Sequence, residues 1–164
     1  MHIWLLTHSQ ELLKANGTGQ LVKAVLGNQC HIVEWSRVNP PTSILELSPD
    51  DTLLIYPEDT QDSFSSIEDV GSATPWKNFI ILDGTWQQAR KIYNRSPDLH
   101  GLRKHAIEHL TSSYTRRRNQ VVGGLCTAEI AIYLLEQQLE RKNAKSLKER
   151  FEAFNRQTAN VDED

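Results

Sequence analysis

A run of four apolar residues, Phe79 to Leu82, is the feature that most restricts the fold of this chain. A strand that is apolar at every position has both faces covered, which is typical of a central strand in a parallel sheet. The run ends at Asp83-Gly84-Thr85, a sequence that favours a turn. Residues 86–93 are good helix formers. We therefore predict a central strand, a turn and a helix over this segment.

The same alternation recurs along the chain. Ile3–Leu6 is another short apolar run, and apolar residues recur at helical spacing between Gly19 and Gly27. Ser146 and Glu149 have the spacing of a capping box that starts a last helix. Strands are predicted at 3–6, 31–35, 52–56 and 79–82, with a further candidate at 106–110, and helices at 21–26, 86–93, 128–139 and from 146. This order predicts an α/β fold, a mainly parallel sheet with helices on both faces.

The two C-terminal helices are each expected to bury one face. Residues predicted to face the core are Ile130, Ala131, Leu134, Leu135 and Leu139 in the first, and Leu147, Phe151 and Phe154 in the second. Residues 156–164 are predicted to form a disordered tail. At 164 residues the chain is long enough for one domain, 1–164, with its own core.

Composition excludes several classes of protein. The apolar content of 38% and the charged content of 24% are those of an ordinary globular chain. The longest apolar runs are far shorter than the roughly 20 residues of a membrane span, and the start lacks the pattern of a signal peptide. We therefore expect a cytoplasmic protein. Its two cysteines, Cys30 and Cys126, are too few for a disulfide framework or a metal site and are expected to be buried thiols.

Charge is distributed unevenly. The formal net charge is −3, which taken alone argues weakly against a nucleic-acid partner. The stretch Arg90–Arg118, however, holds eight basic and two acidic residues, a local charge of +6, whereas 50–69 holds seven acidic residues and no Lys or Arg. This polarity predicts one face for an anionic partner and another that repels it.

Asp83 is the first candidate for chemistry, because ligands of open α/β sheets bind beyond the carboxyl ends of the strands. A turn aspartate that caps the next helix is the alternative. Thr85 can cap that helix itself, which leaves the Asp83 carboxylate available. The ring of Trp86 can either stack on a flat ligand or pack in the core, and the sequence favours neither.

Two further clusters accompany it. His8 to Lys14 and then Asn16-Gly17-Thr18-Gly19 precede a helix, whose N-terminus favours anions. Their spacing matches neither phosphate-binding nor dinucleotide-binding motifs, so a plain loop is the alternative. Ser112–Arg118 contains an arginine triplet beside Tyr114 and is followed by Gly123–Glu129. That combination suits phosphate contacts beside a small-ligand pocket, although an arginine triplet is usually a solvated face.

In this order the clusters resemble the DTW-domain family, the tRNA-uridine aminocarboxypropyltransferases, from about Leu5 to about Leu135. Asp83-Gly84-Thr85-Trp86, with its trailing Gln-Ala-Arg, is similar to the family's Asp-x-Thr-Trp segment. The other matching motifs are His8-x-x-Glu11-x-x-Lys14 with Thr18-Gly19, Tyr56-Pro57, Ser112-x-Tyr114-x-x-Arg117, and Thr127-x-Glu129-x-Ala131. Three positions depart from the family pattern: Gly17 stands where the family has Asn, which here lies one place earlier at Asn16, Gln20 stands where it has Arg, and Cys126 where it has Ser.

The resemblance implies a SPOUT-like fold with a C-terminal trefoil knot beside an S-adenosylmethionine pocket. It implies transfer of the 3-amino-3-carboxypropyl group from that donor to N3 of a tRNA uridine, releasing 5′-methylthioadenosine, without a metal. A carboxylate is suited to remove the N3 proton or to orient the base.

The resemblance also assigns roles to individual residues. The catalytic residues would be Asp83 and Thr85. Donor-binding residues would be Tyr56, Pro57, Leu82, Asp83, Trp86, Leu125, Thr127 and Glu129, with Thr127 anchoring the methionine carboxylate and Glu129 holding the amino group. RNA-binding residues would be His8, Lys14, Arg90, Tyr114, Arg116, Arg117 and Arg118. For Glu129, a favourable charge in the first helical turn is an equal alternative. The expected partner is tRNA, without a membrane, and a monomer is favoured.

Two other functions fit the same residues. A methyltransferase using the same donor would release S-adenosylhomocysteine, because a fold does not fix which sulfonium substituent leaves. A non-catalytic RNA-binding module would bind tRNA without any stabilisation by the donor. A hydrolase is disfavoured, since no Gly-x-Ser-x-Gly turn is present.

Overall fold

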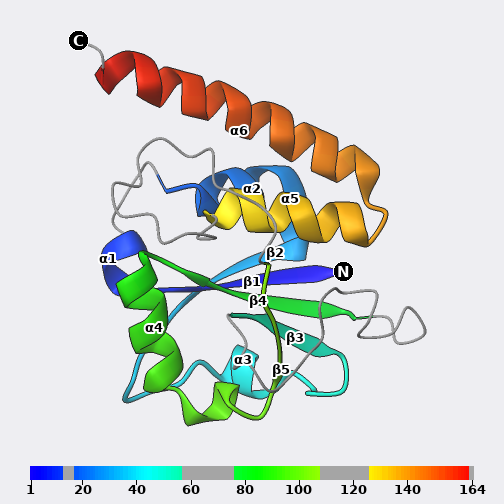
Figure 1. Cartoon of the computed structure of the whole chain (residues 1–164). Coiled ribbons are helices and arrows are strands. Elements are labelled where there is room, and N and C mark those ends of the chain that lie inside the picture. Colours follow the sequence, from blue (N-terminus) through cyan, green and yellow to red (C-terminus); the bar gives the residue numbers. More distant parts are fainter. Residues whose placement is uncertain (13–16, 57–75, 108–125, 163–164) are drawn as a thin grey trace.

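A computed structural model of the chain describes residues 1–12, 17–56, 76–107 and 126–162 (Figure 1). Its centre is a sheet of five strands in the order β2-β1-β4-β3-β5, with every neighbouring pair parallel. The strands are β1 His2–Thr7, β2 Cys30–Glu34, β3 Thr52–Ile55, β4 Asn78–Asp83 and β5 Arg103–His105. The prediction of a parallel α/β sheet is therefore confirmed.

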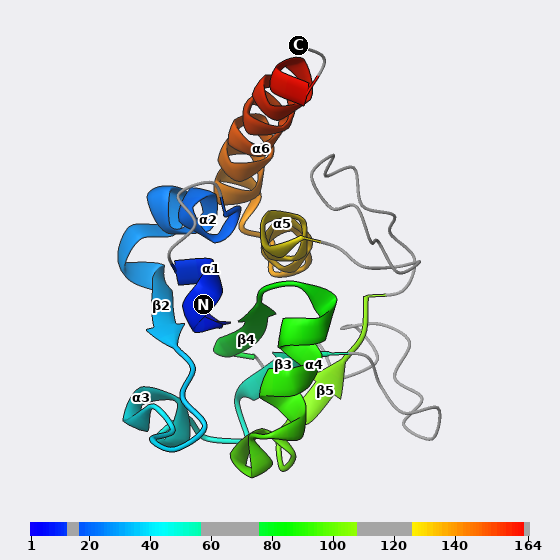
Figure 2. The same ribbon diagram turned by 90° about the vertical axis from the view of Figure 1, so that its left-hand side faces the viewer.

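Helices cover both faces of this sheet. In Figures 1 and 2, α2 and α5 lie on one face, α6 lies across them, and α3 and α4 lie on the other face. The helices are α1 Ser9–Leu12, α2 Gly19–Leu26, α3 Thr42–Leu45, α4 Trp86–Asn94, α5 Thr127–Gln137 and α6 Arg141–Asp162, with 3₁₀ turns η1 Gly27–Gln29 and η2 Pro97–Leu99. The sequence did not predict α3, α1 or η2, which are short and follow no sustained apolar pattern.

Strand β4 shows why four consecutive apolar residues are needed at the centre. Phe79 and Ile81 pack in the core under α2, α5 and α6. Ile80 and Leu82 pack in the second core, which includes α4. All four side chains are buried. Because successive side chains of a strand point to opposite faces, the central position of β4 requires apolar residues throughout.

The order of the strands creates a switch point between β1 and β4. After β1 the chain continues to β2, which lies at one end of the strand order. After β4 it continues in the opposite direction, past β3 to β5 at the other end. Such a reversal opens a crevice at the carboxyl ends of the two strands, where open α/β sheets bind ligands. Thr7 and Asp83, the last residues of β1 and β4, are paired in register at this point.

The fifth strand lies earlier in the chain than the sequence predicts. The candidate at 106–110 is wrong for Ala106 and Ile107, which are not part of a strand, and 108–110 lie outside the described residues. Strand β5 instead uses Arg103–His105, which pairs with Leu53–Ile55 at the sheet edge. An edge strand needs only one row of main-chain hydrogen bonds, so a polar segment can form it without an apolar run.

The junction between α5 and α6 corrects one prediction. Leu139 does not face the core: it is 71% exposed, and its φ of +62° closes the end of α5. The amide of Glu140 donates to the carbonyl of Leu135, and the amide of Leu139 to that of Glu136, a pattern that terminates helices with a left-handed residue. The chain thus turns before Leu139 can join the apolar face.

Helix α6 begins before the predicted capping box. It starts at Arg141, so Ser146 lies within the helix, because buried Ala144 extends the apolar stripe of Leu147 and Phe151 by a turn. Of the three residues predicted to be buried, Phe154 is only half-buried. The helix also continues through 156–162, for which the sequence predicts a tail.

Both cysteines are buried and free, as predicted. In the part of the chain that the structure describes, none of the helices has the length and apolar character needed to cross a membrane. The same residues contain no group of three or more His, Cys, Asp or Glu side chains arranged to hold a metal ion.

Candidate active site at the carboxyl edge of the sheet

The carboxylate of Asp83 is the centre of the crevice. Asp83 continues the alternation of β4, so its side chain lies on the face covered by α2 and α5. The hydroxyl of Thr127, the first residue of α5, donates to Asp83 Oδ1 over 2.6 Å. That length is typical of a hydrogen bond between a hydroxyl and a charged carboxylate. Asp83 is half-buried and Thr127 is 2% exposed, so this bond is shielded from solvent.

Thr7 provides a second, weaker contact. Its hydroxyl lies 3.4 Å from Asp83 Oδ2 and 3.0 Å from the carbonyl oxygen of Leu5. A threonine hydroxyl has one proton to donate, so the two acceptors share it, and the shorter bond goes to the carbonyl. The sequence interpretation missed Thr7. The feature that could have identified Thr7 is its position at the end of the strand that neighbours β4.

Gly19 lets helix α2 approach the carboxylate closely. A Cβ atom at Gly19 would lie 2.9 Å from Asp83 Oδ2 and 3.2 Å from Leu5 Cδ1, so any larger side chain would displace one of them. The adjacent Thr18 accepts a hydrogen bond from the amide of Ala128 in α5. The Gly17–Gly19 segment therefore connects the starts of α2 and α5 at the carboxylate.

The start of α4 leaves Asp83 without a capping role. Thr85 accepts a hydrogen bond from the amide of Gln88, and the Gln88 side chain accepts one from the amide of Thr85, which completes a capping box. The prediction that Thr85 caps this helix is confirmed. Gly84 has a φ of +155°, and a Cβ there would lie 2.7 Å from Gln88 Oε1, so the turn requires glycine.

The start of α5 has a capping box of its own. Oε1 of Glu129 accepts a hydrogen bond from the amide of Cys126, whose side chain accepts one from the amide of Glu129. Cys126 thus takes the N-cap position that serine occupies in the family pattern. Glu129 lies in the first turn of α5, as the helical alternative requires, and its contact with the donor's amino group stays a prediction. The hydroxyl of Thr127 contacts Asp83, where the sequence comparison assigned it to the donor's carboxylate.

Burial keeps both thiols protonated. Burial, helped by the nearby Glu129 carboxylate, raises the pKa of the Cys126 thiol from its usual 9.0 to about 12. Burial likewise raises the pKa of Cys30 to about 11, against an opposing effect of Lys23. A thiol is nucleophilic as the thiolate, so these cysteines serve packing and capping.

A small cleft opens beside the carboxylate. Its volume is about 10 Å³, the room that one water molecule needs. The described residues that line it come from β1, α1, the start of α2, β2 and β4, and are Thr7, Leu12, Gly17, Gly19, Gln20, Ile32 and Asp83. Leu82 is not among them, because its side chain packs in the core on the α4 side of the sheet.

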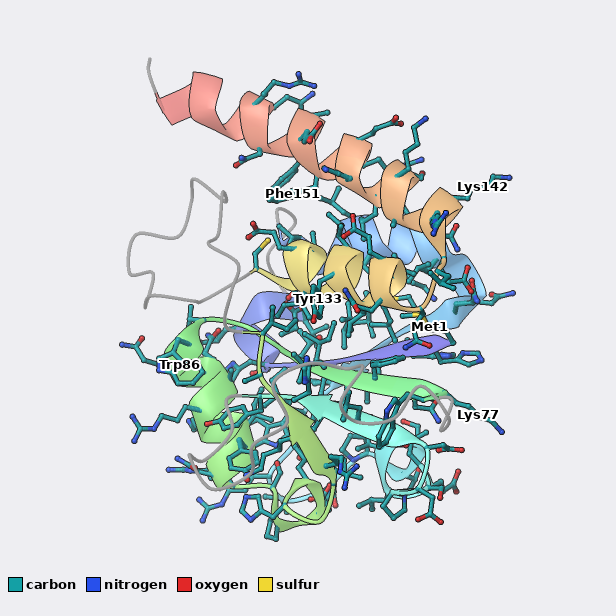
Figure 3. The ribbon with its side chains drawn as sticks, turned by 45° about the vertical axis from the view of Figure 1, so that its right-hand side comes forward. Met1, Lys77, Trp86, Tyr133, Lys142 and Phe151 are labelled. Carbon is teal, nitrogen blue, oxygen red and sulfur yellow. The ribbon has the colours of Figure 1, made fainter. Side chains whose placement is uncertain are left out.

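Two aromatic rings lie on the α4 side of the same edge. Tyr56 follows β3, and its ring stacks on that of Trp86 with the ring centres 5.8 Å apart. Trp86 is 36% exposed, so of the two roles open to it the structure excludes burial in the core. Figure 3 shows Trp86 at one end of the molecule, opposite Met1 and Lys77.

The charged residues singled out in the sequence lie at both edges of the sheet. Arg90 in α4 is exposed, and half-buried His8 directly follows β1, so both lie near the carboxyl edge. His8 stacks on Trp35, which itself follows β2. Asp50 and Asp51 precede β3 and therefore lie at the opposite edge, and the other five acidic residues of 50–69 lie outside the described residues. Other residues assigned from the sequence lie outside the described residues: Lys14, Pro57, Tyr114, Arg116, Arg117, Arg118 and Leu125.

Comparisons with known proteins agree on one family. A family model described as DTW domain matches residues 1–159. The tRNA-uridine aminocarboxypropyltransferase 2 of Drosophila melanogaster is 40% identical over 85 residues, which are 51% of this chain and 33% of that protein. The chain thus aligns with about a third of that relative's length. No solved structure is significantly similar to this one.

Proposed function

The chain belongs to the DTW-domain family, and on this premise we propose that it transfers the 3-amino-3-carboxypropyl group from S-adenosylmethionine to N3 of a uridine in tRNA. The observation that carries the proposal is the Asp83 carboxylate at the switch point of the sheet, held by the Thr127 hydroxyl and adjoining an open edge. The name of the Drosophila melanogaster relative supports the same reaction.

The residues around Asp83 fit the charged end of such a donor. The donor carries positive charge on its sulfonium and its amino group, and a fixed carboxylate at the cleft attracts both. The donor is much larger than the cleft, so the described residues form one end of its site. Pro57 and Leu125, which the resemblance also assigns to the donor, lie outside the described residues. When bound, the donor supplies a carbon made electrophilic by the adjoining sulfonium.

Asp83 acts on the acceptor. Uridine N3 carries a weakly acidic proton that must leave as the new N–C bond forms, and the carboxylate takes it as a general base. The C–S bond breaks in the same step, the sulfur keeps the electron pair, and the positive sulfonium becomes a neutral thioether. Thr127 keeps the carboxylate in place through its hydroxyl, so Asp83 need not reorganise during the reaction.

Thr85 supports the acceptor from the start of α4. Its oxygen accepts the Gln88 amide, and its own proton can be donated to a uracil carbonyl. Loss of the N3 proton places negative charge on the two uracil carbonyls, where a hydroxyl donor and the N-terminus of a helix are both favourable. In this arrangement Asp83 accepts the N3 proton, and Thr85 stabilises the negative charge that develops on the uracil carbonyls.

The SPOUT-like fold and its trefoil knot belong to the same proposal. The all-parallel sheet with helices on both faces is compatible with them. The segment 108–125, which joins β5 to α5, lies outside the described residues.

Product analysis tests the proposed function. Purified protein is incubated with S-adenosylmethionine and unmodified tRNA, and the small-molecule product and the digested nucleosides are identified by mass spectrometry. We expect 5′-methylthioadenosine and aminocarboxypropyl-uridine in equal amounts, neither of them forming without tRNA. S-adenosylhomocysteine with a methylated nucleoside would establish a methyltransferase. Tight tRNA binding without either product or stabilisation by the donor would establish a binding module.

A further inference from the structure

Four aromatic rings form a continuous row that begins at the carboxyl edge with Trp86 and Tyr56. Trp86 stacks on Tyr56 at 5.8 Å between ring centres, Tyr56 on Tyr93 at 4.1 Å, and Tyr93 meets His100 at 4.5 Å. The rings come from three places in the fold: the residue after β3, helix α4 and the residue after η2. We call these four residues the aromatic row. Its two ends, Trp86 and His100, are exposed, and its middle is half-buried.

Positive charge accompanies this row. Nζ of Lys104 lies 5.1 Å from the ring centre of Tyr93 and donates to its hydroxyl over 2.9 Å. Arg90 is four residues after Trp86 and three before Tyr93, so the helical period places it on the same face of α4. Three more exposed basic residues lie on these elements or directly after α4, namely Lys91, Arg95 and Arg103. Asp98 is the only acidic residue among residues 86–107.

We propose that the aromatic row binds unpaired RNA bases, and that the exposed face of Trp86 stacks on a nucleotide that neighbours the target uridine. Alternating aromatic and basic side chains are the usual surface for single-stranded nucleic acid, since bases stack on the rings and phosphates meet the charges. This inference rests on the proposed function for the choice of RNA and of uridine. It adds the requirement that the substrate be locally single-stranded.

The position of Trp86 connects the row to the reaction. Only Gly84 and Thr85 separate it from Asp83, yet the Asp83 carboxylate faces α2 and α5 while Trp86 lies on the α4 side. The two side chains therefore flank one edge of the sheet. A uridine that enters at this edge towards Asp83 leaves its neighbour on the α4 side, where Trp86 is available.

Charge favours RNA over the donor as the ligand of Trp86. S-adenosylmethionine is a net cation, and the basic residues of α4 and β5 repel it, whereas they attract the phosphates of RNA. An aromatic row that served only to stabilise the fold would be expected to end inside the protein. Instead Trp86 is the one aromatic among the large apolar side chains that are exposed in the described residues; the others are Val38, Leu45 and Leu139.

Fluorescence of Trp86 tests the proposal without requiring turnover. Wild-type protein is titrated with an oligouridylate of about ten nucleotides, within the span that such surfaces cover, and with a duplex of equal length. We expect the oligouridylate to quench tryptophan fluorescence and the duplex to quench it far less. Quenching should be lost in Trp86→Leu, since Trp76 is buried and Trp4 and Trp35 are less exposed.

Affinity and its salt dependence separate stacking from charge. Trp86→Ala should weaken oligouridylate binding by about 5-fold to about 150-fold, with the slope against salt unchanged, and Trp86→Phe should restore most of the loss. Arg90→Ala should reduce the slope of log affinity against log salt concentration by about one, the value expected for the loss of one phosphate contact. Leu45→Ala removes an apolar side chain on α3 that is more exposed than Trp86, and it should change neither quantity.

Unchanged oligouridylate affinity and quenching in Trp86→Ala would overturn the proposal. So would equal binding of duplex and single strand, or a loss confined to S-adenosylmethionine binding, which would assign Trp86 to the donor. The outcomes distinguish this inference from the proposed function. Trp86-dependent binding of single-stranded RNA without 5′-methylthioadenosine formation refutes the reaction alone, and transfer that is unaffected in Trp86→Ala refutes the aromatic row alone.

Discussion

Two helix starts flank Asp83, and they differ in exposure although both use a capping box. At the start of α5, Cys126, Thr127 and Ala128 are at most 2% exposed, and the Thr127 hydroxyl points at the carboxylate. At the start of α4, Thr85 and Trp86 are exposed. The same local motif thus occurs in two settings: the buried start of α5 holds the carboxylate, and the exposed start of α4 is open to solvent.

The difference follows from what each helix adjoins. Helix α5 packs between the sheet and α6, so its first turn is enclosed and its polar groups need partners within the protein. Helix α4 has a polar outer face, and its first turn lies at the sheet edge. A buried first turn tolerates few substitutions, because each of its polar groups needs a partner within the protein.

Chemical reactivity of the thiols is the strongest test of the enclosed helix start. Because burial raises the pKa values of Cys30 and Cys126 to about 11 and about 12, we expect iodoacetamide at pH 8 to label them at least about 100-fold more slowly in the folded protein than in guanidinium. Mass spectrometry of intact protein follows the labelling. Fast labelling of folded Cys126 would show that the start of α5 is open.

The same raised pKa values predict how stability depends on pH. Between about pH 9 and about pH 12 the folded protein keeps thiol protons that the unfolded chain has lost, so the free energy of unfolding should fall as pH rises through this window. Below it the thiols contribute no pH dependence. Denaturant unfolding at several pH values measures this effect, and Cys126→Ser should show a shallower fall than wild type.

Removing the hydroxyl of Thr127 should have the next largest effect. Thr127→Val keeps the shape of the side chain and leaves Asp83 without its short hydrogen bond, so we expect unfolding to become easier by about 1.5–3 kcal/mol. Transfer activity should fall as well, because the carboxylate is no longer held. Thr127→Ser keeps the hydroxyl and should stay close to wild type in both urea unfolding and activity. Equal behaviour of the two variants would refute the holding role.

Gly19→Ala tests how closely helix α2 packs against the Asp83 carboxylate. The added methyl would lie 2.9 Å from Asp83 Oδ2, and we expect a loss of stability at the lower end of roughly 1–3 kcal/mol. The larger consequence is a displaced carboxylate and a reduced kcat. Gly101→Ala is the matched control, since a Cβ there meets nothing within 4 Å. Wild-type kcat in Gly19→Ala would contradict the close packing of α2 against Asp83.

Thr85→Ala should have the smallest effect on stability. Loss of the cap of α4 destabilises by about 1 kcal/mol, and Thr85→Ser should restore it. Kinetics with tRNA then separate the cap from the proposed contact to uracil. A kcat that falls much further in Thr85→Ala than in other variants of equal stability supports the contact, and a kcat that follows stability alone refutes it.

The sequence predicted the parts of the fold that depend on apolar patterning. Phe79–Leu82 predicted the central strand and its neighbours, because a strand covered on both faces leaves a continuous apolar run. The turn at Asp83 and the cap at Thr85 were also predictable, since their chemistry is local. Patterning could not locate β5, because its residues Arg103–His105 contain no apolar run and it is identified by its pairing with β3. It also missed the turn at Leu139, a left-handed position without glycine.

The site was predictable at its centre and less so around it. Asp83 follows from its place after the most buried strand, but its partners depend on contacts across the chain. Thr127 is 44 residues away along the chain and Thr7 is 76. The role of Gly19 depends on how closely α2 approaches the carboxylate. Such contacts arise from tertiary packing, which no local pattern in a single sequence encodes.

The most direct test of the central claim is the rate of transfer in Asp83→Asn. Asparagine fits the site, because its carbonyl can accept from Thr127 and its amide can donate to Thr7, so the variant should melt and bind tRNA like wild type. With the base removed, we predict that single-turnover formation of 5′-methylthioadenosine slows by at least about 100-fold. A folded Asp83→Asn protein that transfers at the wild-type rate would contradict the account.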